Sequence, residues 1–479
     1  MKLTRQVIGM YFFTLVFVSN AFADLDPMAK LTNLVMDMQK QMVEMRKTVE
    51  EQNEKIKQLE IRDPQVQIAA PSTGVTDYTS QMSDDEFNRR LGKALGGANQ
   101  WLNDLKFSGD LRLRYEALQF TSGNPAETDD RTRFRYRLRY GFEKKFSDEM
   151  KVGFALASGE STSGQNVDPT STNQSFDNLF NLKDIFIEKA FATYSPSWAK
   201  FGPIDKAEIT GGKFVNPFEQ GSSDMVWDRD VRPEGAYEKA SLNLLDIKDL
   251  DLKGYAIAGQ FILDEDSVGG GHADSELYAY QLGLNVVADT PFFEEPMNFL
   301  SALSYYSYSD YATNGNFLIG TTSLARGNSN FIGAATELDA EDFEVLEFYN
   351  ELSIRPFGIG FRPFLDIAHN AAAKSEQDDE TWAWALGTKI GGLKKKSDWE
   401  LSYAYRRIEN DSVVGAFNDS DFGLGFAGKR GSVVKFGYAL TDNIFLNGGA
   451  YFVNNLATDT GGVRDEEQRR FQADLSWKF

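Results

Sequence analysis

The chain has no cysteine and only two histidines. The absence of cysteine excludes disulfide scaffolds, thiolate metal sites, cysteine nucleophiles and a lipid-modified N-terminal cysteine. His272 and His369 are too few for a histidine-based zinc site or a Ser-His-Asp enzyme, so we expect no enzyme, metal or cofactor. Beyond residue 20, no apolar run approaches the ~18 residues of a membrane-spanning helix, which excludes helical spans.

The chain also lacks an excess of cationic residues. Its 479 residues include 50 Lys and Arg against 71 Asp and Glu, which gives a net charge of −21. Binding to nucleic acid needs a basic surface, so nucleic acid is excluded as a partner. Aromatic residues, at 13%, and glycines, at 41, are abundant instead. An acidic, aromatic-rich chain that is polar on average has the composition of an outer-membrane β-barrel.

Residues 1–23 have the three parts of a secretory signal peptide. Lys2 and Arg5 form the basic region, Val7 to Val18 form the apolar region, and Ala21-Phe22-Ala23 is the cleavage site. Removal of Lys2 and Arg5 changes the net charge from −21 to −23. Export of a chain without cysteine predicts the envelope of a Gram-negative bacterium, with the protein in the outer membrane.

Residues 24–61 carry apolar side chains at alternating spacings of four and three, which predicts a coiled coil of about four heptads. At 1.5 Å per residue, residues 28–61 would form a rod roughly 50 Å long. A helix lying on a membrane is the alternative, but its polar face would be expected to be basic. The a and d residues favour a dimer, whereas a trimeric barrel would impose a trimer. Residues 62–82 are predicted to be a linker, and a capping box at Ser83–Glu86 begins a short amphipathic helix over 83–105.

From residue 106 to residue 479 the governing period is two. In RTRFRYRLRYGF, aromatic and leucine side chains share one face, and five arginines share the other. One arginine facing lipid near the midplane costs about 2–4 kcal/mol, so five would exceed a typical fold stability of about 5–15 kcal/mol. The arginines must therefore line a wet interior, because a small soluble barrel fills its interior with apolar side chains.

The alternation and the intervening turns predict an all-β, antiparallel transmembrane barrel of about sixteen strands, with fourteen and eighteen as alternatives. Short turns alternate with long loops, which places both termini in the periplasm. The last strand sets apolar residues on one face and ends the chain. It resembles the signal that the outer-membrane barrel assembly machinery reads, with its main residues at Phe471, Leu475, Trp477 and Phe479.

Three segments carry a family resemblance. FSGDLRLRYE, DDRTRFRYRLRYGF and GGKFVNPFEQGSSDMVWDRDVRPEG resemble the Putative porin family of Gram-negative outer membranes, within the wider trimeric porin architecture. The resemblance implies a homotrimer and an inward-folded third external loop, here residues 217–233, that narrows the channel. The acidic residues of this loop are Glu219, Asp224, Asp228 and Asp230. They would face a basic wall formed by Arg112, Arg114, Arg133, Arg135, Arg137 and Arg139, and such charge arrangements select ions. The alternative is an exposed loop with no constriction.

Three functions remain open at this point. The first is a water-filled porin for passive diffusion of ions and small hydrophilic solutes. The second is a structural protein whose coiled coil tethers the outer membrane to peptidoglycan, and the third is a specific channel for anionic solutes. In each case the barrel would contact lipid and lipopolysaccharide. The overall negative charge indicates cations as the transported ions, whereas the arginine row indicates anions.

Overall fold

The computed structural model describes residues 104–121, 130–162, 165–265, 274–293, 295–311, 318–319, 322–323, 326, 328, 343–372, 380–456 and 467–479. The signal peptide, coiled coil and linker predicted for residues 1–82 lie outside these ranges. The helix predicted over 83–105 lies outside them too, except for its last two residues. Asp104 is in a turn, and Leu105 is the first residue of a strand. Within the described ranges, no helix has the length and hydropathy to cross a membrane.

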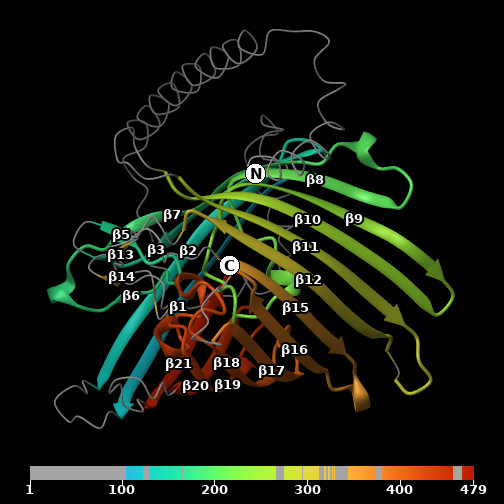
Figure 1. Ribbon diagram of the computed structural model, residues 1–479. Helices are drawn as coiled ribbons and strands as arrows, with labels where there is room; N and C mark the ends of the chain where they lie inside the picture. The colour runs from blue at the N-terminus through green and yellow to red at the C-terminus, as the bar shows by residue number, and fades with distance from the viewer. Residues whose placement is uncertain are drawn as a thin grey trace, which may run out of the picture. The chain divides into compact units, whose positions relative to one another are not determined.

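Sixteen antiparallel strands close into a barrel, which confirms the predicted strand number (Figure 1). Neighbouring strands pair in chain order, and the last strand closes the ring on the first, from Asp110 opposite Lys478 to Thr121 opposite Glu467. The barrel strands are β1 (Leu105–Thr121), β2 (Arg131–Lys145), β3 (Met150–Ser158), β7 (Ile185–Tyr194), β8 (Ile204–Lys213), β9 (Glu234–Ile247), β10 (Leu250–Asp264), β11 (Ser275–Ala288), β12 (Met297–Ser309), β15 (Glu344–Ser353), β16 (Phe361–Asn370), β17 (Trp382–Gly391), β18 (Trp399–Ile408), β19 (Lys429–Ala439), β20 (Ile444–Asn455) and β21 (Glu467–Lys478).

Short strands and 3₁₀ turns occupy the loops. β6 (Gln174–Ser175) pairs with β2 at Arg135 and Tyr136, beyond the part of β2 that pairs with β3. The remaining short elements are β4 (Ser161–Thr162), β5 (Gln165–Val167), β13 (Leu318–Ile319), β14 (Thr322–Ser323), η2 (Asn178–Phe180), η3 (Ser197–Ala199), η4 (Glu219–Gly221), η6 (Pro356–Gly358), η7 (Gly415–Phe417) and η8 (Gly423–Gly425).

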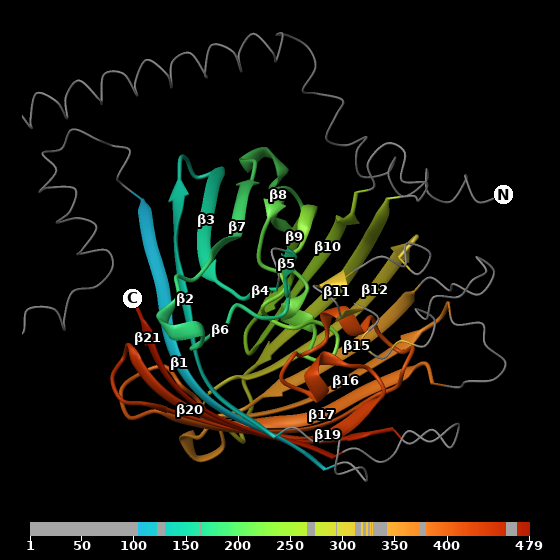
Figure 2. The ribbon, with the colours of Figure 1, turned by 90° about the vertical axis from the view of Figure 1, so that its left-hand side faces the viewer.

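Two long loops fold into the barrel (Figure 2). The loop between β8 and β9, residues 214–233, is called L3, and the loop between β18 and β19, residues 409–428, is called L7. L3 begins earlier than predicted, because β8 ends at Lys213. Pro217 has no N–H to give to a strand ladder, and the Phe214 side chain joins an apolar cluster inside the barrel.

The barrel wall is polar on its inner face and apolar on its outer face. On β2, the outward-facing Phe134 and Tyr140 are 57% and 47% exposed. On the inner face of β1 and β21, Glu116 and Arg470 are only 0% and 2% exposed. This order is the reverse of that in a soluble protein and suits a barrel that is surrounded by lipid.

The inner space is divided between an apolar part and a charged part. L3 places Phe218, Met225 and Trp227 against the inner faces of β10 to β12, where they pack on Phe261 and Tyr306. These contacts fill the side of the barrel that includes β10 to β12. The polar face of L3 is thereby turned toward the charged side chains of β1, β2 and β17 to β21.

Candidate functional site

The six arginines of the predicted basic wall are on the inner faces of β1 and β2. The strand register places Arg112 opposite Arg137 and Arg114 opposite Arg135. Cross-strand neighbours of like charge repel each other, so this row needs carboxylates to stabilise it.

Those carboxylates come from the wall itself. Glu116 lies 2.6 Å from Arg133 and 3.9 Å from Arg135, and Asp110 lies 2.7 Å from Arg137. The row is therefore largely compensated before any loop reaches it.

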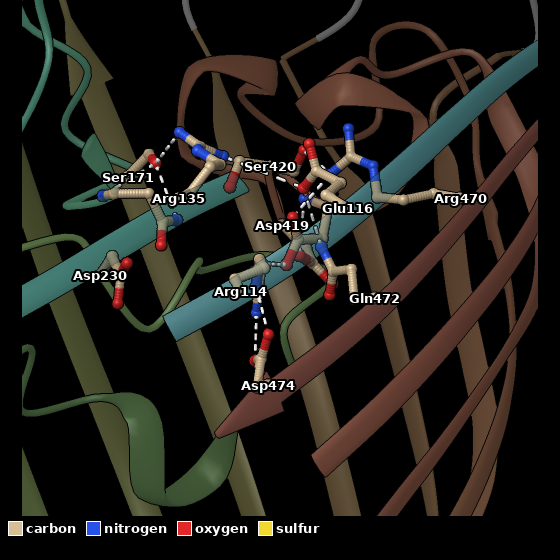
Figure 3. Close-up of polar contacts among 12 residues, drawn as sticks. Arg114, Glu116, Arg135, Ser171, Asp230, Asp419, Ser420, Arg470, Gln472 and Asp474 are labelled. Atoms are coloured by element: carbon tan, nitrogen blue, oxygen red, sulfur yellow. Dashed lines mark hydrogen bonds and ion pairs between the residues drawn. The ribbon is translucent and has the colours of Figure 1, made fainter. Parts of the chain in front are cut away.

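Asp474 on β21 holds Arg114 through two parallel hydrogen bonds (Figure 3). The guanidinium Nε and Nη2 each donate to a carboxylate oxygen of Asp474 at 2.8 Å. Such paired charge-assisted bonds fix both side chains in one geometry. Arg112 is close to the same carboxylate, at 3.8 Å, and also donates to the Asn173 side chain.

L3 is fixed to the wall by polar contacts as well as by its apolar cluster. Ser222 Oγ donates to Glu347 at 2.6 Å, and the Ser223 N–H donates to Asp366 at 3.0 Å. The Gln281 side chain donates to the Phe218 carbonyl at 3.1 Å. These contacts set the loop at a defined depth inside the barrel.

Only one of the four predicted L3 acids reaches the arginine row. Asp230 accepts from Arg139 at 2.7 Å. Burial would raise the pKa of Asp230, but the nearby Arg139 and Arg137 outweigh burial and lower it to about 2. Asp230 is therefore charged at neutral pH and bridges L3 to β2.

Asp224 contacts cations on another part of the wall. Its carboxylate lies 2.8 Å from Arg229 in L3, 3.5 Å from Arg406 on β18 and 3.7 Å from Lys435 on β19. Burial would raise the pKa of Asp224, but these cations hold it well below its ordinary value. The geometry thus brings Asp224 together with residues that the sequence did not mark as part of the site.

Asp228 forms no ion pair with a described residue, and Glu219 forms only a long one. Asp228 accepts from the backbone N–H groups of Asp230 and Ser420, each at 2.8 Å. Burial raises the pKa of Asp228 well above its ordinary value, and the carboxylates of Asp230 and Asp419 raise it further. Burial also raises the pKa of Glu219, whose nearest cation is Arg232 at 3.9 Å.

L7 is a second loop inside the barrel, and the sequence interpretation missed its role. Its Asp421 lies 3.1 Å from Arg114 and 2.6 Å from Arg470, and its Asp419 lies 2.7 Å from Arg406. The only available indication was the Asp- and Gly-rich segment NDSDFGLGFAG within a long predicted loop.

L3 and L7 also contact each other directly. The Asp228 N–H donates to the Phe417 carbonyl at 2.6 Å, and the Asp419 N–H donates to the Asp224 carbonyl at 3.3 Å. The Trp227 and Phe417 rings stack with centroids 5.2 Å apart. The two loops therefore form one joined structure inside the barrel.

A cavity of about 520 Å³ lies between these loops and the wall. Eight cationic and eight acidic side chains line it. The cations are Arg112, Arg114, Arg137, Arg229, Lys389, Arg406, Lys435 and Lys478, and the acids are Asp110, Asp224, Asp228, Asp230, Glu400, Asp419, Asp421 and Asp474. Such a lining suits water, ions and polar solutes.

No metal site accompanies this cavity in the described ranges. No group of three or more His, Asp or Glu side chains there has an arrangement that could hold a metal ion. His369 stacks on Trp382, with ring centroids 4.2 Å apart. This stacking gives the imidazole a packing role.

A closed barrel with an apolar outer face and a charged interior defines a transmembrane β-barrel that can hold water. The sequence profile of the family described as "Putative porin" matches residues 125–330 and 354–464. This is more than half of the chain, so the chain belongs to that family of outer-membrane porins, as the sequence resemblance indicated.

Several solved porin structures are similar to this chain at low sequence identity. OprB of Pseudomonas putida is 12% identical, with 84% of this chain and 99% of that chain covered and a TM-score of 0.48. OmpT of Vibrio cholerae is 11% identical, with 78% and 97% covered and a TM-score of 0.40. The anion-selective porin of Comamonas acidovorans is 12% identical, with 78% and 99% covered and a TM-score of 0.41. No curated protein matches the sequence.

Proposed function

We propose that this porin is a passive diffusion channel for ions and small hydrophilic solutes, and that L3 and L7 together form its constriction. The observation that carries the proposal is the cavity of about 520 Å³, which cationic and acidic side chains line in equal number. Opposite charges across a narrow wet passage select and orient solutes without chemistry. A barrel that served only as an anchor would not need these organised charges in its lumen.

The remaining assignments belong to the same proposal. The chain is exported by its signal peptide, both termini are periplasmic, and the assembly machinery reads the last strand. The barrel works as a homotrimer in lipid and lipopolysaccharide. The tether to peptidoglycan depends on residues 24–61, which lie outside the described residues, and it stays a prediction. Deletion of residues 24–82 tests it, since permeability should survive while envelope attachment should fail.

Liposome swelling tests the channel function directly. Purified, folded protein is reconstituted into liposomes, which are then diluted into iso-osmotic solutions of uncharged sugars of increasing size. We expect swelling rates that fall steadily as the sugar becomes larger, because a passive channel discriminates by size. Swelling no faster than that of protein-free liposomes would refute the proposal. Saturable uptake of a single sugar would replace it with a specific channel.

A further inference from the structure

The cations that water can reach in the lumen are not those of the arginine row. In that row, the side chains of Arg112, Arg114 and Arg135 are 13%, 6% and 8% exposed. Across the cavity, the side chains of Arg229 and Lys435 are 60% and 41% exposed. A permeating ion therefore meets exposed positive charge from L3, from β19 and from Lys478 at the end of β21.

The strand register gives these exposed cations a defined arrangement. Lys389 on β17 is opposite Ser402 on β18, and Ser402 is opposite Lys435 on β19. Laterally paired residues project from the same face of a sheet, so the Ser402 hydroxyl stands between the two lysines on the inner wall. Next in the row is Gly449 on β20, which adds no side chain to obstruct the approach.

The cations on this side of the cavity share few close acids. Asp224 contacts Arg229, Arg406 and Lys435, and Asp419 contacts Arg406. Glu219 and Glu351 act on Arg229 and Lys389 without forming an ion pair with them. Lys389 makes no hydrogen bond or ion pair with any residue that the structure describes. Lys389 lines the cavity, and its ammonium group has three N–H donors.

We propose that Arg229, Lys389, Ser402 and Lys435 form an oxyanion-binding station in the lumen, which takes small solutes that bear a carboxylate or phosphate group. This inference rests on the proposed channel function and adds a solute class to it. Asp224 acts as the built-in counter-ion of the station and shares its cations with the passing solute. The contacts are few and open to water, so binding is brief and solutes continue through the channel.

The test is planar-bilayer recording of the full chain. In a potassium chloride gradient, we expect a reversal potential that indicates a preference for chloride. Inorganic phosphate and succinate, added in separate experiments, should each reduce the chloride current. The double variant Lys389→Gln with Lys435→Gln should lower the chloride preference. It should also weaken the reduction of current by phosphate and by succinate roughly tenfold, because charge-assisted hydrogen bonds are lost. An effect of only one of the two anions would narrow the station to phosphates or to carboxylates.

Two further variants and a control separate charge from shape. Asp224→Asn should change the chloride preference in the opposite direction, since it removes the counter-ion. A variant with Lys389→Gln and Lys435→Arg keeps one positive charge that the double glutamine variant lacks. Phosphate should therefore reduce its chloride current much more than it reduces that of the double glutamine variant. Lys239→Gln is the control, since it removes a lysine on β9 that does not line the cavity. It should change neither the chloride preference nor the reduction of current by phosphate.

The outcomes distinguish this inference from the channel function. Stepwise openings that prefer potassium, or a chloride preference that the double variant leaves unchanged, would overturn the oxyanion station and leave the channel standing. An absence of openings from folded protein would overturn the channel function and the station together.

Discussion

At the scale of single residues, the lumen is stabilised by charges that are buried in pairs. Arg114 illustrates this, since it lies between Asp474 on β21 and Asp421 in L7. Removing one partner from such a group leaves an uncompensated charge, which costs more than the pair contributes. These contacts therefore hold the barrel wall and L7 in a fixed relation.

Arg114→Ala should destabilise the folded barrel by about 2–3 kcal/mol, because it leaves Asp474 and Asp421 without their shared cation. Reversible urea unfolding in lipid vesicles would measure the loss. Arg469→Ala is the matched control, since the pair that Arg469 forms with Glu467 is exposed and should contribute little to stability. Equal losses in the two variants would contradict this account.

Asp228 should make ion selectivity depend on pH. Its raised pKa keeps the carboxyl protonated above the ordinary range of aspartate. Raising the pH through that pKa adds one negative charge at the junction of L3 and L7, beside Asp230, Asp419 and the Arg139 that pairs with Asp230. The permeability ratio of chloride to potassium should then fall by about two- to threefold.

Recordings in acidic and alkaline buffers measure this ratio. Asp228→Asn cannot ionise, so its ratio should lack this change with pH. The same carboxyl should lower the free energy of unfolding as the pH rises through the raised pKa, because the folded chain then binds more protons than the unfolded chain. A ratio that changes equally in wild type and variant would assign the effect to another group.

At the scale of elements, the strands were predictable from their period. The inward fold of L3 followed only from the family resemblance, and that of L7 was not predicted. Alternating residues on β2 must face either lipid or lumen, so a period of two determines both the strand and the direction of each side chain. L7 carries no such period, and its inward fold depends on contacts with L3 and with Arg114. The partner of Arg114 was equally hidden, because Asp474 is 360 residues away and comes near only when the ring closes.

Gly221 should determine how closely L3 packs against the barrel wall. A Cβ at this position would lie 2.4 Å from the Ala302 Cβ and 2.8 Å from the Tyr255 hydroxyl, which is too close for either. Gly221→Val should therefore displace L3 and speed tryptic cleavage after Arg229, which limited proteolysis would detect.

Gly211→Val is the matched control for this experiment. A Cβ at Gly211 has no heavy atom nearer than 3.8 Å, so the variant should be cleaved at the wild-type rate. Cleavage of Gly221→Val at that same rate would mean that L3 tolerates the displacement.

At the scale of the whole molecule, we propose that the assembly machinery reads the last strand, which also completes the barrel wall. This strand closes the barrel, with the Gly109 N–H donating to the Phe479 carbonyl at 2.7 Å and the Phe479 N–H donating to the Gly109 carbonyl at 3.1 Å. These are backbone bonds, which Phe479→Ala preserves. The substitution should therefore lower the amount of barrel assembled in cells while purified protein still refolds in detergent.

Heat-modified gel mobility measures the folded fraction in both settings. Phe436→Ala removes another outward-facing aromatic ring from the wall and should leave assembly in cells unchanged. If both variants lowered the amount of assembled barrel in cells to a similar degree, the apolar area of the outer face would limit assembly. Recognition of the last residue would then not be the cause.

The central claim is that the barrel conducts through a passage narrowed by L3 and L7. Single-channel conductance in planar bilayers tests it most directly, with wild type compared with a variant whose residues 219–230 are replaced by a short Gly-Ser linker. The account predicts stepwise openings in both proteins, with clearly larger steps in the variant. Equal steps would contradict the constriction, and no openings from folded wild-type protein would contradict the channel itself.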